Sequence, residues 1–247
     1  MIQLNRLQSH KLRSSKMGDK LIGFYESIWQ EDLTTIANDT IRNIKYSITN
    51  PYLLFPSAEY EYAAIRVMIF GQETFTWGGE FQQYGITPSV TGLLSLFDLF
   101  VNEDWGSNTP FWRFVSWIRE YLRDERCNNI ALIPNNLVKV GRNGQTGFDR
   151  DVFVASQRLN LINREIDILH PDIIISLSGP SYDNVIKDIF GDYREEIIDL
   201  DIRLSSLHID NLSIPFYRLY HPKYLNISGN TERAKREVLN IINKITS

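Results

Sequence analysis

The sequence predicts an α/β protein, a three-layer α/β/α sandwich with a central four-stranded parallel sheet. Two observations predict this fold class. Short apolar runs without helical spacing recur along the chain, and segments with helical spacing lie between them. Continuously apolar runs are typical of parallel strands covered on both faces. Strands that alternate with helices build right-handed β-α-β units, and these units produce a layered sandwich.

Four apolar runs are predicted as strands, at residues 65–70, 129–133, 172–177 and 214–220. Helical patterns are predicted over residues 91–100, 110–123, 149–169, 182–190 and 231–245, and earlier over residues 20–29 and 39–47. Residues 1–16 are basic and are predicted as a flexible arm, and residues 17–247 as a single domain. Function is expected at the carboxyl ends of the strands, where ligands bind in open α/β sheets.

The bulk composition narrows the classes of protein and of site. The 247 residues carry a formal net charge of -4, so any contact with nucleic acid must come from a local basic patch. A single cysteine, Cys127, excludes both an internal disulfide framework and a four-cysteine metal or iron–sulfur site. We therefore expect no cofactor and no metal. No apolar run approaches the roughly 18 residues of a membrane span, and we expect a cytoplasmic monomer without membrane contact.

The segment after the first predicted strand, residues 71–79, carries candidate chemistry. Gly71 and two later glycines allow the backbone to turn tightly and approach a ligand. Glu73 is a carboxylate that could act as a general base or hold a water molecule. Phe75 and Trp77 offer flat surfaces for a planar ring. The alternative is a surface turn with a solvated Glu73 and aromatic rings that pack in the core.

The segment after the second predicted strand contains Asn136, Lys139 and Arg142. An amide side chain presents a donor and an acceptor side by side, which suits the edge of a pyrimidine. Lys139 and Arg142 are the candidate phosphate-facing charges. The alternative for the asparagines is turn capping, because asparagine tolerates the left-handed backbone.

Two further strand ends complete the set. Ser178 lies in a small-residue turn that leads into a helix, a setting in which backbone N–H groups can hold a phosphate. His221 and Lys223 follow the fourth strand, with a proline between them, and Lys223 is a further candidate phosphate-facing charge. A histidine here can donate a hydrogen bond to a developing negative charge, although a single histidine is more often structural.

In their order along the chain, these four segments resemble the motifs of the uracil-DNA glycosylase superfamily. Residues 71–75 (GQETF) occupy the place of its first motif, GQDPY or GE-x-PG. Residues 136–140 (NLVKV) are similar to the NVVKC segment of the iron–sulfur branch. Residues 171–179 resemble its P-x-x-I-x-x-L-G strand, and residues 220–225 its HP-x-YL segment. The resemblance covers about residues 60–245.

The resemblance implies a role for each matching position. Glu73 stands where the family has its water-activating aspartate, and His221 matches the histidine that stabilises the departing base. At Gln72 the resemblance implies a contact with the base or the anion. Asn136 matches the asparagine that reads the uracil edge. Phe75 stands where a tyrosine excludes thymine. The implied activity is hydrolysis of the N-glycosidic bond of uracil, or of a related damaged base flipped from DNA.

The sequence also departs from the family pattern. Thr74 stands in place of the motif proline, and glutamate replaces aspartate at position 73. The last motif lacks a serine to grip a flanking phosphate, and the cluster cysteines are missing. Three residues are candidates for the ring that stacks on the base: Trp77, Phe81 and Tyr84.

These departures keep two alternatives open. One is a non-catalytic nucleotide- or nucleic-acid-binding module that keeps the glycosylase fold. The other is hydrolysis of a small nucleoside or nucleotide, which suits the acidic charge balance better than duplex DNA does. The partner is accordingly single- or double-stranded DNA, or a nucleotide.

Overall fold

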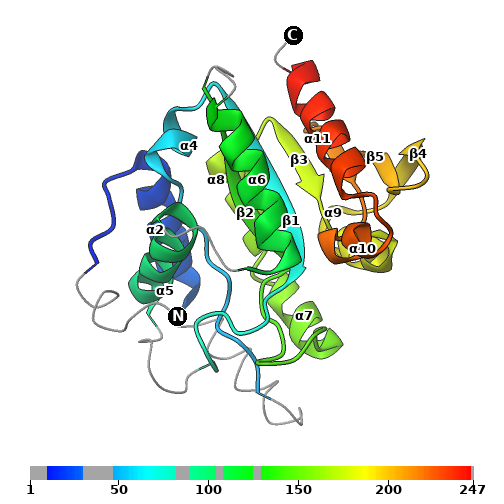
Figure 1. The fold of residues 1–247 in the computed structure, drawn as a ribbon. Helices are drawn as coiled ribbons and strands as arrows, with labels where there is room; N and C mark the ends of the chain where they lie inside the picture. Colours follow the sequence, from blue (N-terminus) through cyan, green and yellow to red (C-terminus); the bar gives the residue numbers. More distant parts are fainter. Residues whose placement is uncertain (1–9, 30–46, 82–88, 104–107, 125–128, 246–247) are drawn as a thin grey trace. The chain divides into compact units, whose positions relative to one another are not determined.

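Parallel and antiparallel strands share one sheet in this α/β protein (Figure 1). The computed structural model describes residues 10–29, 47–81, 89–103, 108–124 and 129–245. The chain divides into two compact units. The first unit comprises residues 1–61, 73–104 and 136–169, and the second comprises residues 62–72, 105–135 and 170–247.

The sheet has six strands in the order β2-β1-β3-β6-β5-β4. Their bounds are β1 Ile65–Glu73, β2 Ile130–Val138, β3 Ile173–Ser176, β4 Tyr193–Asp199, β5 Leu204–Ile209 and β6 Phe216–Arg218. Strand β3 runs parallel to both β1 and β6, while β5 is antiparallel to both β6 and β4. The four predicted strands form, but the prediction of a four-stranded, all-parallel sheet is wrong, because residues 193–209 add an antiparallel hairpin at one edge.

Helices of the second unit cover both faces of this sheet. They are α6 Pro110–Asp124, the short 3₁₀ helix η3 Pro180–Tyr182, α9 Asp183–Phe190, α10 Pro222–Ile227 and α11 Thr231–Ile245. Val67 and Ile69 of β1 point toward α6 and α11, with which they form one buried cluster. On the opposite face, Phe190 of α9 packs against Phe70 and Phe216, at centroid distances of 6.2 and 5.3 Å. The alternation of apolar side chains along β1 therefore buries both faces.

The first unit is largely helical. It contains α2 Lys16–Ile28, α5 Val90–Phe97, the π-helix η2 Asp98–Glu103, α7 Arg150–Gln157 and α8 Leu161–Leu169, and α4 Ala58–Tyr62 ends at its boundary. The single helical segment predicted over residues 149–169 is two helices, because Asn160 adopts a left-handed backbone with φ of 49° between them. The helix predicted over residues 39–47 lies, except for Ser47, outside the described residues.

The N-terminal boundary of α2 is set by a cap. The Ser15 side chain accepts a hydrogen bond from the Gly18 amide at 2.9 Å, and Ser15 itself is buried. Such a bond satisfies one of the amides that the first helical turn leaves unpaired. Of the arm predicted over residues 1–16, residues 10–16 are described, and they lead directly into this capped helix.

Candidate functional site

Glu73 closes β1 in the first unit, and its carboxylate is held by the loop that follows β2. Glu73 Oε1 accepts a hydrogen bond from the Gly147 amide at 2.8 Å. The side chain is half-buried rather than freely solvated. A carboxylate fixed by a backbone amide keeps its second oxygen in a defined position, as a general base or a water-holding group requires.

Thr74, which stands where the resembled motif has proline, is a buried junction of three loops. Its hydroxyl lies 2.8 Å from Thr49 Oγ1 and accepts a hydrogen bond from the Gly141 amide at 2.9 Å. A β-carbon on Gly141 would lie 2.0 Å from the Thr74 carbonyl oxygen. The departure from the motif is therefore compensated locally, because the hydroxyl supplies a contact that proline lacks.

The two aromatic residues of this loop have different environments. Phe75 is 52% exposed. The Trp77 ring packs instead in an aromatic cluster, 4.6 Å from the Tyr52 centroid and 5.6 Å from that of Phe100. Phe75 is thus the solvent-facing ring of the motif. Of the other stacking candidates, Phe81 is buried in a small core and Tyr84 lies outside the described residues.

The end of β2 corrects one sequence prediction. Asn136 and Arg142 are half-buried, as a pocket-lining role allows. Lys139 is 4% exposed, its Nζ lies 2.6 Å from Glu165 Oε2, and it donates to the Tyr52 carbonyl at 2.9 Å. The prediction that Lys139 faces a phosphate is therefore wrong, because a buried carboxylate already neutralises its charge.

In the second unit, the ends of β1 and β3 are tied together. Gln72 Nε2 donates a hydrogen bond to the Ser178 carbonyl at 2.8 Å, next to the buried backbone of Gly71. The Ser178 hydroxyl is buried and lies 2.8 Å from Ser176 Oγ, so a phosphate at this turn would have to be held by backbone N–H groups. The turn continues through Gly179, whose φ of 71° suits glycine.

His221 is the N-cap residue of α10, shortly after the end of β6, and its ring has a defined orientation. Nδ1 accepts a hydrogen bond from the Lys223 amide at 3.2 Å, and the ring stacks on Phe111 at 6.4 Å with an interplanar angle of 11°. Burial, with a smaller effect of the Lys223 charge, lowers the pKa of His221 to about 4. The imidazole is therefore neutral at pH 7 and carries its proton on Nε2.

Phe111 is a residue that the sequence does not single out. It lies near the start of an amphipathic helix, where an aromatic residue is expected to pack in the core. Its stack on His221 is the contact that connects it to a predicted site residue. Lys223 is exposed, so its charge is accessible to a phosphate, as predicted for a phosphate-facing residue of the second unit.

The predicted site residues are divided between the two units. Glu73, Phe75, Trp77, Asn136, Lys139 and Arg142 belong to the first unit, and Gly71, Gln72, Ser178, His221 and Lys223 to the second. Within each unit the structure holds part of the set in place by hydrogen bonds, at Glu73 in one and at Gln72 and His221 in the other.

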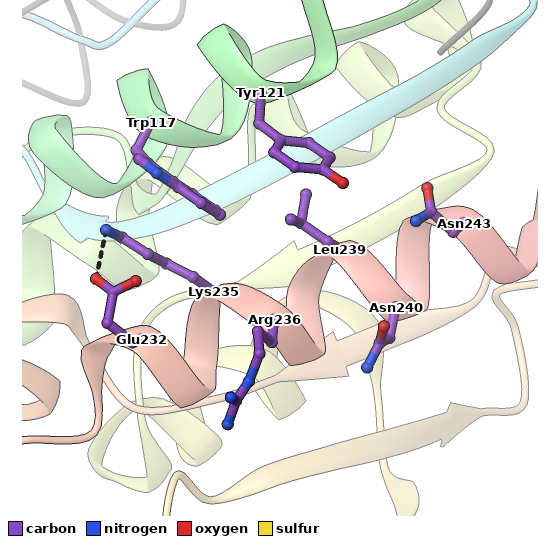
Figure 2. Close-up of a pocket in the computed structure, with 8 residues that line it drawn as sticks. All are labelled: Trp117, Tyr121, Glu232, Lys235, Arg236, Leu239, Asn240 and Asn243. Carbon is purple, nitrogen blue, oxygen red and sulfur yellow. Dashed lines mark hydrogen bonds and ion pairs between the residues drawn. The ribbon is translucent and has the colours of Figure 1, made fainter. Parts of the chain in front are cut away.

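A groove lies elsewhere in the second unit, between α6 and α11 (Figure 2). Its volume is about 350 Å³. Lys235 Nζ lies 4.6 Å from the Trp117 ring centroid and 2.7 Å from Glu232 Oε1. Tyr121 stacks beside Trp117 at 5.8 Å. The aromatic surface of Trp117 is therefore already engaged by Lys235 and Tyr121, and none of the predicted site residues lines this groove.

Comparison of the sequence with models of protein families and with curated proteins finds no match. Among the described residues, no helix combines the length and apolar character that a membrane crossing requires.

Proposed function

We propose that this protein is an N-glycosyl hydrolase that removes uracil, or a related damaged base, from DNA. The observation that carries the proposal is the state of His221. Its Nδ1 is occupied by the Lys223 amide, its ring is fixed on Phe111, and its lowered pKa leaves a neutral imidazole. Such a group donates from Nε2 without needing to be protonated first, which suits a leaving base that departs as an anion.

The reaction assigned to this donor is simple in outline. The bond between the base nitrogen and the sugar C1′ breaks, and both electrons leave with the base. Water adds to C1′ and loses a proton, and the released base accepts one. A hydrogen bond from His221 Nε2 stabilises the charge that develops on the base, and such donors lower barriers most in water-excluded sites.

The remaining roles rest on the resemblance to uracil-DNA glycosylases. Glu73 corresponds to the residue that holds the attacking water, and its bond from the Gly147 amide supports that role by fixing one carboxylate oxygen. Asn136 corresponds to the residue that reads the base edge. Phe75 corresponds to the ring that excludes thymine, and its exposure keeps that surface accessible.

The test is base release from uracil-containing single- and double-stranded oligonucleotides, scored as alkali-labile abasic sites, with free uridine assayed in parallel. His221→Ala should lower activity about 100-fold or more, the usual effect of losing an anion-stabilising donor. His208→Ala is the matched control, because His208 is exposed and pairs with the exposed Glu196. The proposal fails if no uracil substrate is cleaved at high enzyme concentration, or if both variants have wild-type activity.

A non-catalytic binding module is the second candidate, and two observations favour it. The Gln72 amide is engaged by the Ser178 carbonyl, and Lys139 is withdrawn into a buried ion pair. Both contacts occupy groups that the sequence predicts to bind the substrate. Saturable binding of uracil-containing oligonucleotides, measured by fluorescence anisotropy and without base release, would favour this candidate over the enzyme.

A further inference from the structure

Three side chains with metal-binding atoms meet in the first unit, away from the motifs described above. His10 lies in the segment before α2, and Asp98 and Glu103 are the first and last residues of η2. One ligand atom from each residue lies within 4.8 Å of those of the other two. His10 Nε2 is 2.8 Å from Asp98 Oδ2.

The central carboxylate is that of Asp98, which is buried and has no lysine or arginine partner among the described residues. The Asp98 side chain is 5% exposed, and in the described part of the chain its side-chain partners are the His10 ring and the Asn102 amide. Removing a carboxylate from water is costly unless a cation compensates it. Glu103 adds a second carboxylate to the same cluster, so even a protonated His10 would leave the three groups with a negative charge.

The π-helix places Asp98 and Glu103 on the same side of η2. Its i→i+5 hydrogen bonding widens the turn, so residues five apart lie near one another, and such turns occur frequently at functional sites. The intervening Asn102 donates from Nδ2 to Asp98 Oδ1 at 2.7 Å and also to the Phe55 carbonyl at 3.1 Å. This amide holds one Asp98 oxygen and leaves Oδ2 directed at His10, as second-shell partners orient metal ligands.

We propose that His10 Nε2, Asp98 Oδ2 and the Glu103 carboxylate bind one divalent transition-metal ion. The ion replaces the hydrogen bond between His10 and Asp98 and compensates the buried carboxylate. One imidazole with two carboxylates favours zinc, cobalt or manganese over calcium and magnesium, which prefer oxygen ligands alone. Three protein ligands leave coordination positions for water.

The ion would join two segments that lie far apart in the sequence, since 88 positions separate His10 and Asp98. The cysteine count excludes a cysteine site but says nothing about a mixed histidine and carboxylate site. The binding also holds the segment before α2 against η2. The inference is independent of the proposed glycosylase activity and can succeed or fail without it.

The test is titration of chelator-treated, tag-free protein with Zn²⁺ by calorimetry and with Co²⁺ by visible absorption. We expect about one equivalent of each ion to bind, with a Co²⁺ d–d band. The variants His10→Ala and Glu103→Gln should each weaken binding at least tenfold, because even the loss of an outer-shell partner typically costs about 10–100-fold in metal affinity. Glu103 is exposed, so its substitution tests the site without disturbing the interior.

His208→Ala supplies the matched control, because His208 and Glu196 form an exposed histidine–carboxylate pair that no third ligand joins in the described part of the chain. It should bind the ions as the wild type does. The proposal is overturned if the wild type binds less than half an equivalent. It is equally overturned if His10→Ala and Glu103→Gln, shown to be folded by circular dichroism, bind like the wild type, or if His208→Ala alone loses the ion.

Discussion

Lys139 Nζ lies 2.6 Å from Glu165 Oε2, and neither side chain is more than 4% exposed. Tyr25 donates a hydrogen bond to the other Glu165 oxygen at 2.8 Å, and Lys139 also donates to the Tyr52 carbonyl. Burial lowers the pKa of Lys139, while the charge of Glu165 opposes that shift. The pair links α2, α8 and the end of β2 inside the first unit.

Glu165→Gln should therefore destabilise the protein by about 3–5 kcal/mol, because it leaves the Lys139 ammonium buried without a counter-charge. The double substitution Lys139→Met with Glu165→Leu should be closer to the wild type than the single one, since apolar side chains of similar volume often replace a buried pair at little cost. Urea unfolding followed by circular dichroism measures both.

The control for this prediction is Asp167→Asn on the same helix, α8. Asp167 pairs with Arg164 at 3.6 Å, and both side chains are more than half exposed. Exposed pairs contribute about 0–1 kcal/mol. A loss for Glu165→Gln no larger than that for Asp167→Asn would show that the buried pair does not stabilise the first unit.

The same pair shows why the sequence predicts the strands better than the site. A lysine after an apolar strand has the appearance of a surface charge, and only Glu165, on a later helix, makes Lys139 an interior residue. The apolar runs of β1 and β3 are local signals and are confirmed. Contacts such as that between Glu73 and Gly147, 74 positions apart, leave no local pattern.

The missed strands have a similar cause. Strand β4 (YREEIID) is an edge strand whose side chains are mostly exposed, so it lacks the apolar run by which the other strands are recognised. Edge strands are commonly charged, since charge discourages pairing with other chains. Its place in the sheet depends on pairing with β5, which the composition of either strand alone does not indicate.

A second prediction concerns this hairpin. Arg218 of β6 is 1% exposed, and its guanidinium contacts Glu195 of β4 and lies 3.6 Å from Asp183 Oδ1. Glu195→Gln should cost about 2 kcal/mol, less than a fully buried pair, because Glu195 is one-third exposed. The adjacent Glu196→Gln should cost under about 1 kcal/mol, because Glu196 and its partner His208 are both exposed. Chemical denaturation of both variants compares the two positions, and equal losses would contradict the prediction.

A third prediction follows from the junction at Thr74. Gly141→Ala places a β-carbon 2.0 Å from the Thr74 carbonyl oxygen, and a backbone group cannot rotate away as a side chain can. We expect a loss of about 1–3 kcal/mol or more, together with weaker base release if the Glu73 loop supports catalysis. Thermal and urea unfolding measure the stability.

The matched substitution is Gly23→Ala in α2, where a β-carbon meets nothing within 4 Å. Alanine is the better helix former, so this variant should gain about 0.5–1 kcal/mol. If Gly141→Ala were as stable as Gly23→Ala, the three loops at Thr74 would have to be more adaptable than their hydrogen bonds indicate.

The last prediction is a pH dependence that originates at His221. Its pKa is about 4 in the folded protein and about 6.5 when unfolded, so between these values the unfolded state binds more protons. The contribution of His221 to the free energy of unfolding is therefore fully present above pH 6.5 and is lost as the pH falls toward 4. After a discount for partial exposure, the contribution is about 1–3 kcal/mol.

Urea unfolding at a series of pH values should show this loss in the wild type and not in His221→Gln, while His208→Gln should keep it. NMR titration of the His221 ring should give a midpoint near 4, and base release should not decline as the pH rises from 6 to 8, because the neutral imidazole is the proposed donor. A ring midpoint near the unperturbed 6.5 would instead mean that His221 is solvated, and the neutral donor would lose its structural basis.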